Sequence, residues 1–154
     1  MGRYGKPGCS ALRRGRCSQA GGLYFVTTVT EQRIPWFQVF DFARLLCQAL
    51  QQPASLGDAS NLCWVVMPDH AHLLLQLDSV PLDRVIQRFK SRTAIRLNRE
   101  IGRTGRFWQP SYFEHAIRAA EDVRDVARYI VANPLRAGLV KRVGDYPYWN
   151  ATWL

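Results

Sequence analysis

Residues 64–77 read WVVMPDHAHLLLQL, two apolar runs that flank the pair Pro68-Asp69. Proline and aspartate favour tight turns, so this stretch is predicted to form an antiparallel hairpin. Successive side chains of a strand point to opposite faces, which places His70 and His72 together on one face. Residues two apart on a strand are separated by roughly 6 to 7 Å, and two imidazoles could close on one divalent ion with bonds of about 2.1 Å. Two hydrogen-bonded histidines on a half-exposed strand are the alternative.

The rest of the chain supplies the elements of an α+β fold. Residues 23–30 (LYFVTTVT) are β-branched and aromatic, as is typical of a strand, whereas 81–99 carry apolar groups at helical spacing. The expected order is strand 23–30, helix 36–50, loop 51–60, strand 62–67, the histidine strand, helix 81–99, strand 112–119 and a last helix that ends before Pro134. This is the ferredoxin-like (split βαβ) plan, an antiparallel sheet with helices on one face, plus an extra C-terminal helix. We expect the open face to bear the histidines.

The charge of the chain indicates its kind of partner. Its 154 residues suit one domain, and 21 Lys+Arg against 12 Asp+Glu give a net charge of +9, which favours a polyanion. Only three of these basic residues are lysines, and guanidinium groups suit phosphate and base contacts, so nucleic acid is the expected partner. The four cysteines form no C-x-x-C pair, and free thiols are expected.

Membrane segments are not predicted. No apolar run approaches the ~20 residues that span a bilayer, and the N-terminus lacks the apolar region of a signal peptide. We therefore expect no membrane partner and a cytoplasmic, nucleoid-associated protein.

Three segments are candidate nucleic-acid contacts. Residues 1–20 are rich in Gly and Arg and predict a flexible basic arm, with a frayed terminus as the alternative. Arginines recur every fourth residue on helix 81–99, and the loop 101–112 could lay a tryptophan on a base, although tryptophan is more often buried. The candidates are Arg13, Arg14, Arg16, Arg84, Arg88, Arg92, Arg96 and Trp108. The aromatic tail from Lys141 is expected to wrap over the core.

The last helix carries a tyrosine in an unusual place. At about 100° per residue, its apolar residues cluster on one side, and Tyr129 lies roughly 130° from the centre of that cluster. A structural tyrosine would more often lie on the apolar side. Asn133, four residues further on, shares the face of Tyr129 if the helix stays regular up to Pro134.

Four segments together resemble a known family. MPDHAHLLLQL, RFKSRTAIRLN, FWQPSYFEHAIR and ARYIVANPLRAGLV, in this order, are similar to the REP-associated tyrosine transposases, a bacterial branch of the single-tyrosine transposases of the HUH nuclease superfamily. The similarity covers about residues 21–154, which we expect to be a single domain with its aromatic tail.

The resemblance implies a site and a reaction. His70 and His72 match the metal-binding pair of the family, Tyr129 its nucleophile, and Asn133 the position of a polar third ligand. Family members bind single-stranded DNA with hairpins, here expected to be repeated extragenic palindromes (REP), and cleave it by transesterification, leaving a 5′-phosphotyrosine and a free 3′-hydroxyl. The mixed nitrogen and oxygen ligands suit Mn²⁺ or Mg²⁺. In related transposases the tyrosine helix can serve the partner subunit, so a monomer and a homodimer both stay open.

Two other functions are compatible with the sequence. A non-catalytic ferredoxin-like module could bind single-stranded DNA or RNA through the open sheet face and the arginines. A metal hydrolase could act through activated water without a covalent intermediate. Within the enzyme hypothesis, Tyr112 is the reserve nucleophile.

Overall fold

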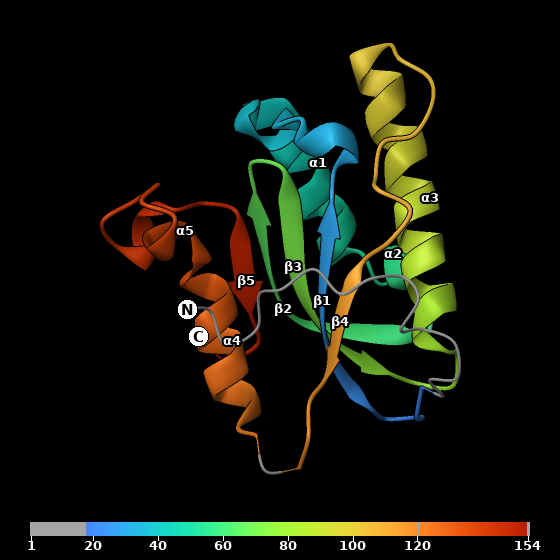
Figure 1. Ribbon diagram of the computed structural model, residues 1–154, viewed down its shortest axis with the longest axis vertical. Coiled ribbons are helices and arrows are strands. Elements are labelled where there is room, and N and C mark those ends of the chain that lie inside the picture. The colour runs from blue at the N-terminus through green and yellow to red at the C-terminus, as the bar shows by residue number, and fades with distance from the viewer. Residues whose placement is uncertain (1–17, 120, 154) are drawn as a thin grey trace.

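The computed structural model describes residues 18–119 and 121–153, so Arg13, Arg14 and Arg16 of the predicted arm lie outside the described residues. A five-stranded antiparallel sheet runs through its centre (Figure 1). The strand order is β4-β1-β3-β2-β5. The strands are β1 (Leu23–Val29), β2 (Ala59–Met67), β3 (His70–Leu77), β4 (Phe113–Ala116) and β5 (Trp149–Ala151). The predicted α+β class and the four predicted strands are confirmed.

The fifth strand comes from the aromatic tail, in which only packing over the core was expected. It pairs with the edge of β2, where Ala151 lies opposite Cys63. Tyr146 lies between the 3-10 turn η4 (Val143–Asp145) and β5. Its hydroxyl donates to the carbonyl of Val66 at 2.6 Å. The tail therefore covers the core by completing the sheet.

The β2–β3 hairpin forms at the predicted turn. Met67 and His70 pair directly across Pro68-Asp69. The hydroxyl of Thr30 donates to the carbonyl of Asp69 at 3.0 Å, and the backbone N–H of Phe37 donates to the carbonyl of Pro68 at 3.0 Å. Both turn carbonyls are therefore held by the segment that follows β1.

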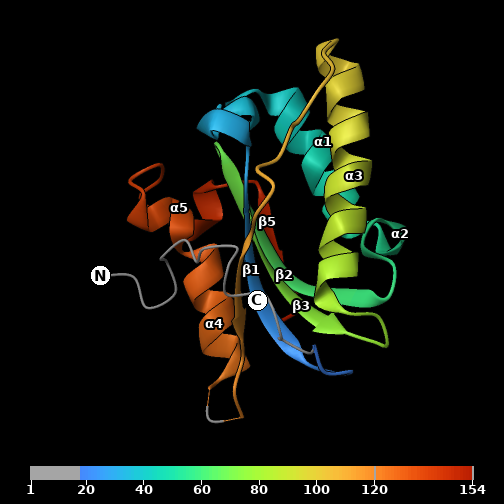
Figure 2. The same ribbon diagram turned by 45° about the vertical axis from the view of Figure 1, so that its right-hand side comes forward.

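One face of the sheet is covered by α1 (Phe40–Gln51) and α3 (Leu82–Ile101) (Figure 2). The predicted first helix is divided, because the 3-10 turn η3 (Trp36–Gln38) precedes α1, and the expected loop 51–60 contains the short helix α2 (Pro53–Leu56). α3 ends at Gly102, whose φ of 71° suits glycine. No helix of the described residues combines the length and the apolar character needed to cross a membrane.

The second face of the sheet is covered as well, which corrects the expectation of an open face. There α4 (Val123–Val131), followed by α5 (Asn133–Arg136), packs on the side of the sheet away from α1 and α3 (Figure 2). The physical reason is that this face is itself largely apolar. It buries Phe25, Cys63, Val65, Met67 and Leu74 against Val126, Ala127, Ile130 and Val131 of α4.

Trp108 belongs to the core, not to a DNA-binding surface. Its side chain is 3% exposed and its indole N–H donates to the hydroxyl of Thr93 at 2.9 Å. The ring packs against Phe37 and Phe89, with centroids 5.7 and 6.2 Å away. A buried indole cannot stack on a base, so the prediction that Trp108 contacts DNA is wrong. The side chain stabilises the core instead.

Two cysteines are described, and both are free thiols as predicted. Burial raises the pKa of Cys47 and of Cys63 to about 12, so both stay protonated at neutral pH. Cys9 and Cys17 lie outside the described residues.

We predict that Thr30→Val destabilises the protein by about 0.5 to 1.5 kcal/mol, because the hydroxyl loses its hydrogen bonds to two part-buried carbonyls, each of which keeps a backbone N–H donor. Thr30 is fully buried, and its hydroxyl contacts the carbonyls of Ile34 at 2.8 Å and Asp69 at 3.0 Å. Urea unfolding followed by circular dichroism measures this change.

Thr28→Val is the matched control, because the buried hydroxyl of Thr28 has no hydrogen-bond partner within the described residues. It should be neutral or stabilising. Equal destabilisation by both substitutions would contradict the role assigned to Thr30.

Candidate active site

The two histidines lie side by side at the beginning of β3. Their ring centroids are 4.8 Å apart and the rings are nearly perpendicular, at 77°. β3 is hydrogen-bonded on both sides: Thr27 of β1 lies opposite His72, and Met67 of β2 lies opposite His70. The pair is thus held on one face of the sheet by its neighbouring strands, as the alternation of the strand predicted.

The ring of His70 is held by the turn residue before it. Its Nδ1 lies 2.6 Å from Oδ1 of Asp69, and Oδ2 of Asp69 accepts from Arg33 at 3.1 Å. Burial alone would raise the pKa of Asp69, but hydrogen bonds and positive charge from His70 and Arg33 outweigh it, so the pKa is lowered. The carboxylate is therefore ionised at neutral pH. In the tautomer whose Nδ1 donates to this carboxylate, Nε2 carries the lone pair that a metal would use.

The ring of His72 is held by a hydroxyl group. Its Nδ1 lies 2.7 Å from Oγ1 of Thr27. Burial is the main reason that the pKa of His72 falls to about 3, and the nearby charges of His70 and Arg136 lower it further, whereas a side-chain hydrogen bond to Asn133 acts in the opposite direction. His72 is therefore neutral at physiological pH, the form in which imidazole binds metals.

This arrangement fits a divalent metal. Histidines that bind metals commonly use their second ring nitrogen on a carboxylate or another neighbouring group, as His70 and His72 do with Asp69 and Thr27. Within the described residues no group of three or more His, Cys, Asp or Glu side chains could hold a metal. A third protein ligand would therefore be of another type, such as the amide of Asn133.

Tyr129 lies on the same face of the sheet as the histidines. The N-cap residue Asp122 begins α4 by accepting from the backbone N–H of Arg124 at 2.7 Å. The apolar side of the helix then packs on the sheet and leaves Tyr129 half-buried at its margin. Its ring meets Phe25 edge-on at 6.4 Å, and the ring of Phe25 lies 5.4 Å from His72. Tyr129 and His72 of the same chain thus both contact the ring of Phe25.

Asn133 reaches the histidines by a route that the sequence did not predict. α4 ends at Val131, and Asn133 begins α5 because Pro134 follows it. Its Nδ2 donates to the carbonyls of Tyr129 and Ile130, at 3.2 and 2.8 Å, while the side chain also hydrogen-bonds His72. Asn133 and Tyr129 therefore do not lie on one regular helix as expected. Instead, the side chain of Asn133 caps α4 and contacts His72.

Three residues of the site were not singled out from the sequence. Asp69 was interpreted only as a turn residue and Thr27 only as a strand residue, although adjacency to His70 was a usable signal for Asp69. Arg136 gave no signal in the spacing. Its guanidinium carbon lies 3.8 Å from the centroid of the Tyr129 ring, and Nη2 donates to the carbonyl of Tyr129 at 2.7 Å.

The arginines of α3 are not part of this site. Arg92 donates to the carbonyl of Ala54, and Arg96 donates to Oε1 of Gln48 at 2.8 Å, so two of the four interact with α1 and α2. Arg84 and Arg88 are exposed on the same helix. These four arginines of α3 therefore lie across the sheet from the histidines, and their contact with DNA stays a prediction.

Tyr112, the reserve nucleophile, also lies elsewhere. It packs against the core on the α1 and α3 side, with Nζ of Lys90 5.5 Å from its ring centroid. The structure thus brings Tyr129, and not Tyr112, to the histidine pair.

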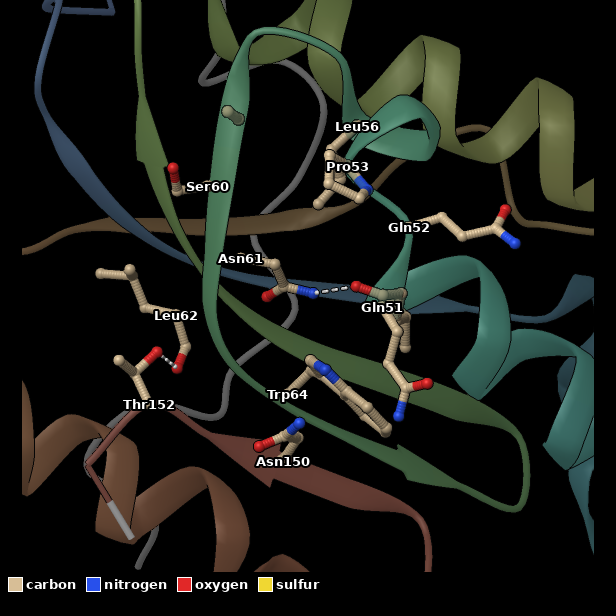
Figure 3. A pocket seen from close by; sticks show the side chains of 12 residues that line it. Gln51, Gln52, Pro53, Leu56, Ser60, Asn61, Leu62, Trp64, Asn150 and Thr152 are labelled. Carbon is tan, nitrogen blue, oxygen red and sulfur yellow. Dashed lines mark hydrogen bonds between the residues drawn. The ribbon is translucent and has the colours of Figure 1, made fainter.

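A pocket of about 330 Å³ lies at the other end of β2, beside α2 and β5 (Figure 3). Amides and hydroxyls dominate its polar lining, and none of its lining residues is titratable: Gln51, Gln52, Ser60, Asn61, Asn150 and Thr152 supply the polar groups. Asn61 is turned to the carbonyl of Leu50, to which its amide donates at 3.3 Å. The pocket is lined by no His, Cys, Asp, Glu, Lys or Tyr side chain and is separate from the histidine site.

The family was identified by comparison with known proteins. The family model described as Transposase IS200 like matches residues 21–133. A Haemophilus influenzae protein assigned as a REP-associated tyrosine transposase is 30% identical over 139 residues, which cover 83% of this chain and 78% of that protein. The REP-associated tyrosine transposase of Escherichia coli K12 is 37% identical over 92 residues, or 55% of this chain and 50% of that protein.

Solved structures agree with this assignment. A REP-associated tyrosine transposase bound to a REP hairpin matches with a TM-score of 0.70 and 27% identity, over 87% of this chain and 79% of that one. A Deinococcus radiodurans structure assigned as a transposase matches with a TM-score of 0.56 and 20% identity, over 86% and 96% of the two chains, and supports the fold alone. The chain therefore belongs to the IS200-like transposases, and within them to the REP-associated tyrosine transposases.

Proposed function

We propose that the protein is a metal-dependent endonuclease and strand-transferase that acts on single-stranded DNA with REP-type hairpins. The observation that carries this proposal is the placement of Tyr129 and the histidine pair on one face of the sheet, linked through Phe25. The solved relative that is bound to a REP hairpin supports hairpin DNA as the partner. Proteins of this kind act on chromosomal DNA, so the cytoplasm and the nucleoid are the proposed location.

The proposed architecture follows the same assignment. Residues 21–154 form one domain of the ferredoxin-like plan, with β5 and the helices α4 and α5 as additions to it. DNA would contact this domain near the histidine face, and the N-terminal arm and the α3 arginines remain candidates for further phosphate contacts.

The proposed reaction is a transesterification. Oη of Tyr129 forms a bond to phosphorus while the bond from phosphorus to the 3′-oxygen breaks. The phenol loses its proton and the 3′-oxygen gains one, so a 5′-phosphotyrosine and a 3′-hydroxyl result without consumption of water. Reversal of the same step on another 3′-hydroxyl joins strands.

A divalent ion, Mg²⁺ or Mn²⁺, held by His70, His72 and Asn133 would offset the charge on the phosphate oxygens. The chain itself keeps both rings ready for this role. Asp69 orients the ring of His70. Thr27 orients the ring of His72, and burial keeps that ring neutral. Phe25 and Arg136 hold the ring of Tyr129 from two sides.

We predict that Tyr129→Phe abolishes the covalent protein–DNA adduct formed on a REP-type hairpin with Mn²⁺, because the attacking oxygen is lost. Denaturing gel electrophoresis detects the adduct. Tyr112→Phe is the matched control and should retain it. An adduct that persists in Tyr129→Phe would refute the assignment of the nucleophile. Cleavage without any adduct would instead indicate hydrolysis by activated water.

Asp69→Asn should weaken metal binding about 10- to 100-fold, because the amide cannot replace a carboxylate that orients His70. Adduct formation measured against Mn²⁺ concentration should shift by this factor and recover at high Mn²⁺. His70→Ala, which removes the ligand itself, should not recover. If His70→Ala leaves both DNA affinity and DNA integrity unchanged, the non-catalytic binding module becomes the better interpretation.

The geometry further predicts that one chain forms a complete site. A mixture of His70→Ala and Tyr129→Phe proteins should then give no adduct, because neither chain carries both halves. Adduct formation on mixing, measured together with the solution mass, would show instead that two subunits share the site in a homodimer.

A further inference from the structure

Arg136 places a positive charge directly over the proposed nucleophile. Its guanidinium carbon is 3.8 Å from the centroid of the Tyr129 ring, and its Nη2 donates to the carbonyl of the same residue at 2.7 Å. The guanidinium is therefore held over the tyrosine, whose ring packs on the face of the sheet that carries the histidine pair.

This position results from the break between α4 and α5. Ala132, with φ −80° and ψ −2°, ends α4, and Pro134 lies in the first turn of α5. In a continuous helix, residues seven apart lie about 10 Å apart along the axis, which would separate the two side chains by two turns. The break lets Arg136 fold back over Tyr129. The carbonyl of Tyr129, near the end of α4, receives its hydrogen bonds from Asn133 and Arg136.

The hydrogen bond to the carbonyl of Tyr129 uses only one of the N–H donors of Arg136. An arginine carries five N–H donors, and Arg136 is exposed. Within the described residues Arg136 forms no salt bridge, whereas Arg128 on α4 pairs with Asp125 at 2.8 Å and Arg142 pairs with Asp145 at 3.0 Å. A cation that has no counter-ion among the described residues and lies over the proposed nucleophile is suited to a substrate anion.

We propose that Arg136 is a catalytic residue that binds a non-bridging oxygen of the scissile phosphate. This inference rests on the proposed transesterification and adds to it the group that would neutralise the phosphate on the side of Tyr129. Negative charge increases on the non-bridging oxygens as the phenolic oxygen approaches, so a fixed guanidinium stabilises the transition state more than the ground state. The guanidinium acts through its charge and its N–H donors, and no proton is transferred to or from it.

The test uses a hairpin substrate in which a methyl group replaces one non-bridging oxygen of the scissile phosphate. The resulting methylphosphonate is neutral and no longer needs the arginine. With native DNA, Arg136→Gln should form the Tyr129 adduct about 10²- to 10³-fold more slowly than the wild type, as expected for loss of one oxyanion donor. With one of the two methylphosphonate diastereomers, the rates of the variant and the wild type should agree within a few-fold.

Two further variants separate chemistry from structure. Arg128→Gln removes a charge from the neighbouring helix, where Arg128 is paired with Asp125, and should behave as the wild type on both substrates. Arg136→Lys keeps the charge and should lose less rate on native DNA than Arg136→Gln. Circular dichroism of each variant checks the fold.

The outcomes distinguish this inference from the function on which it rests. If Arg136→Gln is slowed equally on native DNA and on both methylphosphonate diastereomers, Arg136 only caps α4 and the inference is wrong, while the proposed function stands. If the wild type forms no Tyr129-dependent adduct on native DNA, the proposed function fails and the inference fails with it.

Discussion

The site depends on the register of β3 between its two neighbours. Because β3 is paired on both sides, with Thr27 opposite His72 and Met67 opposite His70, the face of every side chain is fixed. A slip of one residue would turn the histidines into the main core and bring buried leucines out of it. The turn at Pro68-Asp69 sets this register, and the segment after β1 holds both of its carbonyls. The fold and the histidine site therefore rest on the same hairpin.

Burial on both faces of the sheet gives the two histidines different chemistry. His70 is oriented by an ionised carboxylate, while His72 lies beside a hydroxyl and burial keeps it neutral. Had the face been open, water would have screened both rings and no packing would have fixed their orientation. The helix α4 closes this face and carries Tyr129 at its margin, so the same packing both stabilises the sheet and assembles the site.

The end of α4 decides what surrounds the tyrosine. In a helix that continued past Val131, Asn133 and Arg136 would lie one and two turns beyond Tyr129 on the same face, with Arg136 about 10 Å further along the axis. The break before Pro134 instead turns both side chains back, and they satisfy the carbonyl of Tyr129 while they approach its ring and His72. Carbonyls in the last turn of a helix lack intrahelical partners, and here the carbonyl of Tyr129 accepts hydrogen bonds from Asn133 and Arg136.

Local signals in the sequence were enough for four of the five strands, for the main helices and for the shared face of the two histidines. Alternation placed His70 and His72 on one face, helical spacing separated Tyr129 from the apolar side of its helix, and the order of elements predicted an antiparallel sheet. These properties follow from residues close together in the chain, so they do not depend on which other elements pack against the strand or helix. The tertiary structure alone decided which distant groups meet: that α4 covers the histidine face, that Thr27 and Arg136 join the site, and that Trp108 is buried beside Thr93. Such contacts depend on which apolar faces of distant elements pack together and in what orientation. The spacing of residues along one strand or one helix does not determine this packing.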